Sequence, residues 1–259
     1  MKSKSFIIAV AFSCVMIIVP LIFILVVGIE KLPLLWERSY LLKSLKQTLF
    51  ICSLTVIITH LIGIPLAIYI AGSENKFHKF LIYAMLISTL VSGIVKTVSW
   101  ISLLSDNGLI NNTLTSVGVI SQPLDLLYNN FSITVGFVYV MLPLVTINVY
   151  TAVSNIDSDL IKAAKSLGAK SSSVVKRVIL PQVKYEILTS ITIVFVTTLT
   201  LFSIPKVLGG SDKMLAVLLE SSVTSVNYDD AIVVSLVMIV ISSLLILLVG
   251  SIQRKSRWM

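Results

Sequence analysis

The sequence has little charge and few residues of the kinds that catalyse reactions. Only 12% of its 259 residues are charged, and it holds two cysteines and two histidines. No HExxH, GxSxG or GxxxxGK[ST] pattern occurs, and the histidines and cysteines lack the spacing of metal ligands. These absences exclude the familiar zinc hydrolase, serine hydrolase and ATP-hydrolysing motifs. We therefore expect no catalytic residues and no metal, and any ATP-driven work needs a partner chain.

Apolar residues dominate the composition. They make up 56% of the chain, and the mean hydropathy is +1.01. A soluble domain of this length does not hide so much apolar surface, so the sequence predicts a lipid environment. The net charge of +8 is not gathered into a basic patch with interleaved aromatics, so nucleic acid is not an expected partner. Cys14 and Cys52 both lie in apolar runs and are interpreted as packing residues.

Six apolar stretches are long enough to cross a bilayer. They predict an all-α, polytopic membrane protein with six transmembrane helices. The external loop 105–130 contains no Lys or Arg, and the helical spacing of Leu109, Ile110, Leu114 and Val117 predicts a short surface helix within it. The predicted spans are residues 6–29, 48–70, 80–104, 131–150, 187–205 and 231–250.

Basic residues are distributed unevenly between the two sides of the membrane. If the N-terminus is placed inside, thirteen of the twenty Lys and Arg residues lie on inner segments, six lie on outer segments, and Lys96 lies within the third span. The positive-inside rule therefore predicts that both termini are cytoplasmic. No small-residue cleavage site follows the first apolar run, so that run is expected to remain as an anchor.

A polar island, residues 159–181, separates two apolar spans. It is expected to lie in water, because a Lys or Arg at the bilayer centre costs several kcal/mol. Four of its apolar residues have the spacing i, i+3, i+4 and i+7, which places them on one face of a short helix. A small apolar patch ringed by cations is suited to lie against another protein. The four residues are Leu160, Ala163, Ala164 and Leu167.

Helix-ending signals divide the island into two helices. Asp157 and Ser158 are N-cap candidates for the first helix, and Gly168 is its expected left-handed stop. A second helix is predicted from about Ser171 and should end before Pro181, because proline disfavours the helical conformation of the residue before it. The second helix is expected to bury Val174, Val175, Val178 and Ile179.

The same island carries a longer pattern. The pattern begins with two alanines, and a glycine lies four residues after the second. After nine intervening residues come a β-branched residue, one residue of any type and the pair Leu-Pro. In this chain the pattern consists of Ala163, Ala164, Gly168, Val178, Leu180 and Pro181. It resembles the EAA loop of binding-protein-dependent ABC importer permeases, although Lys162 replaces the glutamate and Val178 the isoleucine. The resemblance implies that residues 157–181 form a cytoplasmic coupling helix that docks in a groove of an ATPase subunit.

Two further stretches are similar to the polyamine-type branch of this family. The first, within 108–128, is Gly108-Leu109-Ile110-Asn111 continued by Pro123 and Leu126-Leu127-Tyr128, and the second is 204–210. The resemblance implies a complex in a bacterial cytoplasmic membrane. Its other members would be a second permease subunit, identical or homologous, two ATPase subunits that bind ATP and Mg, and an external solute-binding protein. The chain itself would bind no cofactor. Its expected organisation is a first helix with an external segment (1–43), a permease domain (44–252) and a cytoplasmic tail (253–259).

Polar groups and helix breaks within the spans supply candidates for the solute path. Lys96 lies about 12 Å from the outer end of its span at 1.5 Å per residue, and its long side chain favours a structural or gating role over solute contact. His60 is interpreted as a hydrogen-bonded packing residue, and Asn148 is expected to bond a neighbouring helix. The glycines after the fifth span either line the path or form an outer turn. The path candidates are Lys96, Trp100, Pro205, Gly209 and Gly210.

The sequence thus favours a permease subunit that imports a polyamine. Acidic residues on outer segments favour a cation through their field, whereas Lys96, Lys206 and Lys213 favour an anion such as a phosphonate. Iron is a further alternative on the same scaffold. A stand-alone secondary transporter or channel would need a charged midplane site, and an intramembrane enzyme would need a partner for His60. The outer acidic residues are Asp106, Asp125, Asp212, Glu220, Asp229 and Asp230.

Overall fold

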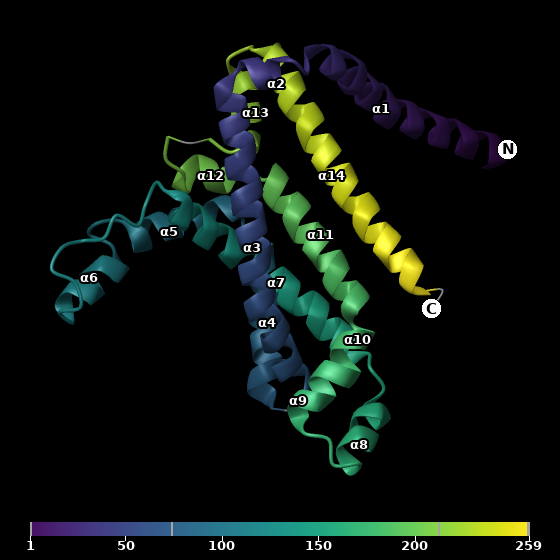
Figure 1. Cartoon of the computed structure of the whole chain (residues 1–259), viewed down its shortest axis with the longest axis vertical. Helices are drawn as coiled ribbons and strands as arrows, with labels where there is room; N and C mark the ends of the chain where they lie inside the picture. Colours follow the sequence, from purple (N-terminus) through teal and green to yellow (C-terminus); the bar gives the residue numbers. More distant parts are fainter. Residues whose placement is uncertain (1, 74, 212, 258–259) are drawn as a thin grey trace.

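The computed structural model describes residues 2–73, 75–211 and 213–257, and every regular element in that part of the chain is a helix. Apart from the N-terminal helix, which projects to one side, the long helices in Figure 1 run roughly along one axis, with short helices at both ends and at one side. The elements are α1 (Lys2–Lys31), α2 (Leu34–Glu37), α3 (Ser39–Ala71), α4 (Lys76–Leu90), α5 (Gly93–Leu104), α6 (Leu109–Ser116), α7 (Asn130–Ser154), α8 (Ser158–Ser166), α9 (Ser171–Val174), a π-helix (Val175–Ile179), α10 (Leu180–Gln182), α11 (Lys184–Thr200), α12 (Ser203–Leu208), α13 (Leu215–Thr224) and α14 (Tyr228–Arg257).

Helices α3, α7 and α11 form the centre of the bundle. Gly63 lets α3 approach α7 closely, because a Cβ at this position would lie only 2.9 Å from Cγ1 of Val145. His60 of α3 is buried, and its Nε2 lies 2.8 Å from the Ser190 hydroxyl of α11, while its Nδ1 lies 2.8 Å from the Val56 carbonyl. Both ring nitrogens are therefore engaged, which confirms the interpretation of His60 as a packing residue.

Two apolar clusters fill the two ends of the bundle. At the end that holds α13, Phe137 and Leu199 pack with Ile204 and Leu215, and all four are fully buried. At the opposite end, which holds α8, the valines of α7 pack against Ala67 and Val174. These two ends are called the α13 end and the α8 end below.

The helices long and apolar enough to span a membrane are fewer than predicted. Among the described residues four qualify, within α1, α3, α7 and α14, and the number rises to six only if each of two bent pairs of segments counts as one span. One pair, Lys76–Leu90 with Gly93–Ser116, bends by 104°; the other, Ser171–Gln182 with Lys184–Thr200, bends by 68°. The apolar composition is as predicted, but two of the six expected spans are not single straight helices.

The predicted third span is interrupted at Val91, which has extended backbone, and at Ser92, which is not helical. A β-branched residue, a serine and then Gly93 are weak helix formers, so the break costs little locally. The predicted fifth span ends early, at Thr200. Pro205 belongs instead to the separate helix α12, near its start, where the missing N–H removes no helical hydrogen bond.

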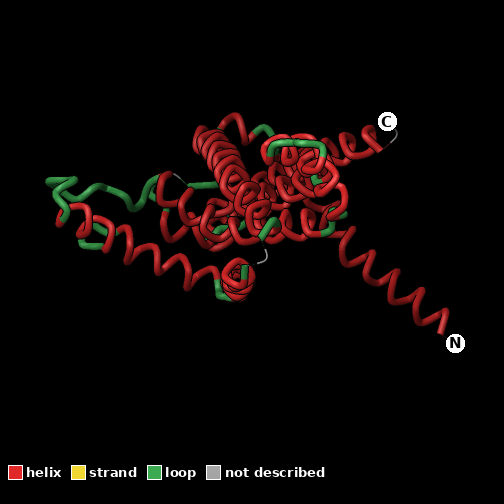
Figure 2. The backbone as a smooth tube through the Cα atoms, turned by 90° about the horizontal axis from the view of Figure 1, so that it is seen from below, coloured by secondary structure: helices red, strands yellow, loops and turns green. Residues whose placement is uncertain are grey.

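Helices α6, α13 and α1 lie around the centre of the bundle. As expected, a short helix, α6, occupies the 105–130 loop. Helix α13 lies in a segment for which the sequence predicted no element, and its Leu215 is fully buried. Helix α1 packs on α14 near its own C-terminal end, with Gly28 against Leu236, and its free end projects away from the bundle (Figures 1 and 2).

Candidate functional site

Helix α8 forms in the polar island as its caps predict. The Asp157 carboxylate accepts a hydrogen bond from the backbone N–H of Asp159 at 2.9 Å and caps the N-terminus. Leu167 ends the helix, and Gly168 adopts φ +80°, the left-handed conformation in which a side chain is strained. In Figure 1, α8 lies at the extreme end of the molecule, beyond the long helices.

The apolar residues predicted for one face of α8 divide between two directions. Leu160 is 48% exposed and Leu167 is 89% exposed, and Ala163 is exposed as well. Ala164 is half-buried and, together with Ile161, packs on the core of the α8 end. The helix therefore rests on its own bundle through one side while Leu160, Ala163 and Leu167 face outward. An exposed leucine pair on so short a helix is a surface suited to a partner.

The second helix of the island is longer and less regular than predicted. It begins at Ser171 as expected, and Val174 and Ile179 are buried while Val175 and Val178 are half-buried. However, it does not end before Pro181. A π-helical turn, Val175–Ile179, widens the backbone and is followed by α10, in which Pro181 occupies the first turn. Hydrogen bonds in a π-turn span five residues, and such turns are frequent at functional sites.

Positive charge surrounds the exposed leucines. Lys162, which replaces the glutamate of the family pattern, lies 3.1 Å from the Asp159 carboxylate, and both side chains are largely exposed. A solvent-exposed pair of this kind contributes little stability, so Lys162 is available to a partner. The exposed basic residues of this region also include Lys165, Lys170, Lys176 and Arg177.

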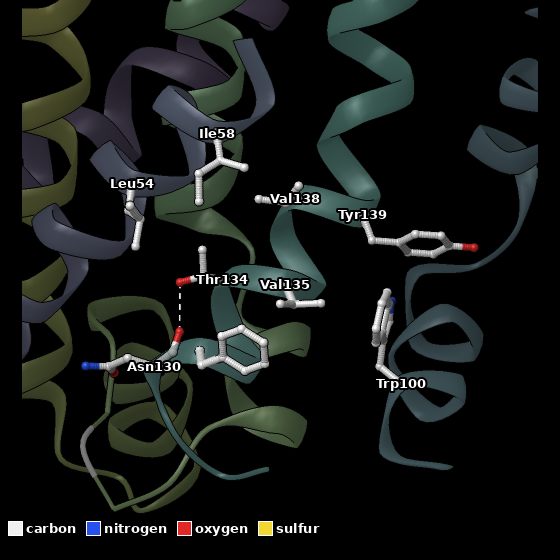
Figure 3. A pocket seen from close by; sticks show the side chains of 9 residues that line it. Leu54, Ile58, Trp100, Asn130, Thr134, Val135, Val138 and Tyr139 are labelled. Atoms are coloured by element: carbon white, nitrogen blue, oxygen red, sulfur yellow. Dashed lines mark hydrogen bonds between the residues drawn. The ribbon is translucent and has the colours of Figure 1, made fainter. Parts of the chain in front are cut away.

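The path candidates do not converge on one cavity. Lys96 is buried in α5, which packs against α7 and α12. Trp100 meets Tyr139 edge to face at 5.6 Å and lines a cavity of about 460 Å³ between α3, α5 and α7 (Figure 3). Of the five candidates only Trp100 lines it. Its other lining residues are mostly apolar, among them Leu54 and Val135, so this cavity offers little that binds a charged solute.

Close backbone approaches explain the two glycines after α12. A Cβ on Gly209 would collide with the Pro205 carbonyl, and one on Gly210 would collide with the Tyr128 carbonyl. Pro205 itself is buried. The outer-turn interpretation therefore accounts for Gly209 and Gly210 without a role in the path.

Ion pairs neutralise much of the outer acidic charge. Asp230 is 2% exposed, and its carboxylate accepts hydrogen bonds from Arg38, from the Tyr40 hydroxyl at 2.6 Å and from Asn227 at 2.8 Å. The Tyr40 hydrogen bond raises the pKa of Arg38, and Asp230 adds to this effect, so the guanidinium stays charged. Two further pairs are Lys31 with Asp229 at 3.3 Å and Lys206 with Glu220 at 2.7 Å.

These pairs correct the expectation of an acidic wall. Asp229, Asp230 and Glu220 each already face a cation, and Asp212 lies outside the described residues. Asp106 and Asp125 stay exposed, as do Glu30 and Glu37 on the same side of the chain. The three paired acids therefore contribute little to a field that would attract a cationic solute.

Comparison with known proteins identifies the family. Residues 4–256 match the family described as "Binding-protein-dependent transport system inner membrane component". The chain belongs to this family. It is thus an ABC importer permease subunit, an inner-membrane transport component and not an enzyme. Permease components of this family bind no cofactor themselves.

The curated relatives include two classes of solute in their names. The spermidine/putrescine transport system permease protein PotB of Haemophilus influenzae is 26% identical over 202 residues, 77% of this chain and 71% of that protein. PotB of Salmonella typhimurium is 26% identical over 183 residues, which cover 71% of this chain and 62% of that protein. A probable molybdenum ABC transporter permease of Haloferax volcanii is 26% identical over 212 residues, 82% of this chain and 76% of that protein. The resemblance to the polyamine-type branch is confirmed at this low identity.

Solved structures show the same fold. A bacterial alginate ABC transporter, in complex with an alginate-bound periplasmic protein, matches 98% of this chain and 94% of its own with a TM-score of 0.82 at 15% identity. The MetNI methionine ABC transporter matches 86% of this chain and 97% of its own with a TM-score of 0.67 at 18% identity. The bent pairs and short helices therefore belong to an importer permease fold.

Proposed function

We propose that this chain forms the membrane path for a small organic cation of the polyamine type. The names of the PotB relatives and the likeness of segments 108–128 and 204–210 to the polyamine-type branch support this solute. We propose that the chain works with a second permease subunit, an external solute-binding protein and two ATPase subunits that bind ATP and Mg. The unequal distribution of basic residues supports an orientation in which the α8 end and both termini are cytoplasmic.

The observation that supports the proposed coupling to an ATPase is the exposed apolar face of α8. Leu160, Ala163 and Leu167 form the docking face for the ATPase, and Gly168 sets the direction in which α8 leaves the second helix. Leu180 and Pro181 follow the π-turn and connect the docking face to α11. A movement of the ATPase would then reach α11 through packed helices, a route that fits a two-state switch.

We also propose how the chain divides. Residues 1–43 comprise the first transmembrane helix and an external segment, and the main packing of α1 is against α14 near the C-terminal end of α1. Residues 44–252 form the permease domain and include the coupling loop 157–181. Residues 253–259 form the tail, whose described part continues α14.

Substitutions on α8 test the docking face. We expect Ala163→Asp to abolish co-purification of the chain with the ATPase, because a carboxylate would be buried in the apolar groove without a partner. Leu167→Ser should weaken co-purification. Val119→Ser, which changes an exposed apolar residue in the 105–130 loop, is the matched control and should leave it unchanged. Normal co-purification of Ala163→Asp would overturn the docking assignment.

Uptake measurements test the solute. Cells that lack the permease gene are given labelled spermidine, a labelled phosphonate or labelled molybdate, with and without the restored gene. Restoration of spermidine uptake alone is the expected result. The anion alternative rests on buried Lys96 and on the molybdenum relative, and recovery of only an anion would replace the polyamine assignment while the importer remains.

A further inference from the structure

A polar cavity lies between α7 and α11 near the α8 end. Its volume is about 430 Å³. It differs from the apolar cavity at Trp100 because six of its eight lining residues are polar. The six are Asn148, Thr151, Asn155, Glu186, Thr189 and Ser190.

The hydroxyl groups in this cavity already have partners, but three other polar groups do not. Thr151 and Thr189 donate to carbonyls of their own helices at 2.9 Å. Within the described part of the chain, no hydrogen bond or ion pair involves the side chains of Asn148, Asn155 or Glu186, and all three are exposed. The expected interhelical bond of Asn148 is therefore absent from this part of the structure.

These unpaired groups determine what this face can contact. An amide or carboxylate turned towards hydrocarbon costs several kcal/mol unless it is hydrogen-bonded. Asn148 lies six residues before the end of α7, about 9 Å along the helix at 1.5 Å per residue. The face is therefore unsuited to lipid and needs water, a polar solute or a polar protein surface.

The charge of the cavity selects the solute. Glu186 is the one charged residue among the lining residues, and the amide oxygens of Asn148 and Asn155 are hydrogen-bond acceptors. We propose that this cavity is the α8-side segment of the solute path and that Glu186 binds an ammonium group of the translocated cation. This inference rests on the proposed function and adds the residues that contact the solute. Neither Lys96 nor the paired acids of the α13 end can supply this negative charge.

Thiol labelling tests whether the cavity is part of a watery path. In a complex whose chain has Cys14 and Cys52 replaced by serine, Asn148→Cys should react with a membrane-impermeant thiol reagent added to inverted vesicles, and spermidine should slow the reaction. Leu61→Cys, at an exposed apolar position of α3, should not react. An unreactive Asn148→Cys would mean that another protein surface covers this face, and the inference would fail.

Uptake kinetics test the role of Glu186. We expect Glu186→Gln to raise the spermidine concentration for half-maximal uptake about fivefold, as loss of one hydrated ion pair implies, and Glu186→Asp to restore most of the affinity. Glu37→Gln removes another exposed carboxylate, in α2, and should leave the affinity unchanged. An unchanged affinity in Glu186→Gln overturns the inference while spermidine uptake by the unmodified chain upholds the proposed solute. If the unmodified chain imports only an anion, the proposed solute fails first, and the assignment of Glu186 fails with it.

Discussion

Two segments of short helices, one at each end of the bundle, differ in how far their apolar side chains are buried. At the α13 end, α12 and α13 bury Ile204, Leu208 and Leu215 completely. At the α8 end, α8 leaves Leu160 and Leu167 48% and 89% exposed. The segments have similar lengths and both connect long apolar helices. The two segments differ in composition chiefly in charge. The burial of their apolar residues therefore depends on whether other helices of the chain pack over them.

The α13 end is closed by the chain itself. Ser132 of α7 donates a hydrogen bond to the Leu208 carbonyl at 2.8 Å, and the Thr48 hydroxyl accepts one from the Leu215 N–H at 2.8 Å. These bonds satisfy backbone groups at the ends of the short helices, which would otherwise be buried without partners. At the α8 end, Leu160 and Leu167 stay exposed among the residues that the structure describes. We infer that the α13 end is scaffold and that the α8 end is the part left for a partner.

The largest expected effect on stability comes from removal of the buried Asp230 carboxylate at the α13 end. Asp230→Ala should destabilise the protein by about 3 kcal/mol, because Arg38 and Tyr40 lose the buried carboxylate that pairs with them. Asp229→Ala removes the half-exposed pair with Lys31 and should cost less than about 1 kcal/mol. Thermal unfolding of the purified protein in detergent compares the two. Equal losses would show that burial of Asp230 adds nothing.

A smaller effect is expected where α12 rests on α7. A Cβ at Gly136 would lie 2.7 Å from the Leu208 side chain and 2.9 Å from the Ile204 side chain, so Gly136→Val should displace α12 at a cost of about 2 kcal/mol. Gly250→Val, where no atom lies within 4 Å, is the matched control. The same thermal assay measures both. A Gly136→Val protein as stable as the control would mean that α12 is not held by this contact.

The smallest effect on stability is expected at Gly168, where a substitution should change transport at the α8 end more than it changes stability. Gly168 and Gly118 have φ values of +80° and +76°, and neither has an atom within 4 Å of the Cβ position. Gly168→Ala and Gly118→Ala should therefore each cost about 1 kcal/mol of backbone strain. Only Gly168→Ala should reduce uptake, because it redirects α8. Equal uptake by the two variants would remove the distinction between a coupling end and a scaffold end.

Many of the helices and the family of this protein can be predicted from the sequence, because the patterns that indicate them are local. Apolar runs predict the four long helices that could span a membrane, the Asp157 cap and Gly168 set the ends of α8 and its turn, and the EAA-like pattern points to the family that residues 4–256 match. Each of these depends on neighbours within a few turns of helix. The outer acids were misread for the same reason, because Asp230 is paired with Arg38, 192 residues away in the chain.

Only the tertiary structure decided the directions in which side chains point and the places where the backbone breaks. The weak helix formers at residues 91–93 permit a break, but the 104° bend between α4 and α5 depends on the packing of both helices against α7 and of α5 against α12. Asn148 and Glu186 lie 38 positions apart, and the packing of α7 against α11 brings them to one cavity. The sequence determined which residues are polar. Helix packing determined which of them share a face, because that depends on rotations and contacts between segments distant in the chain.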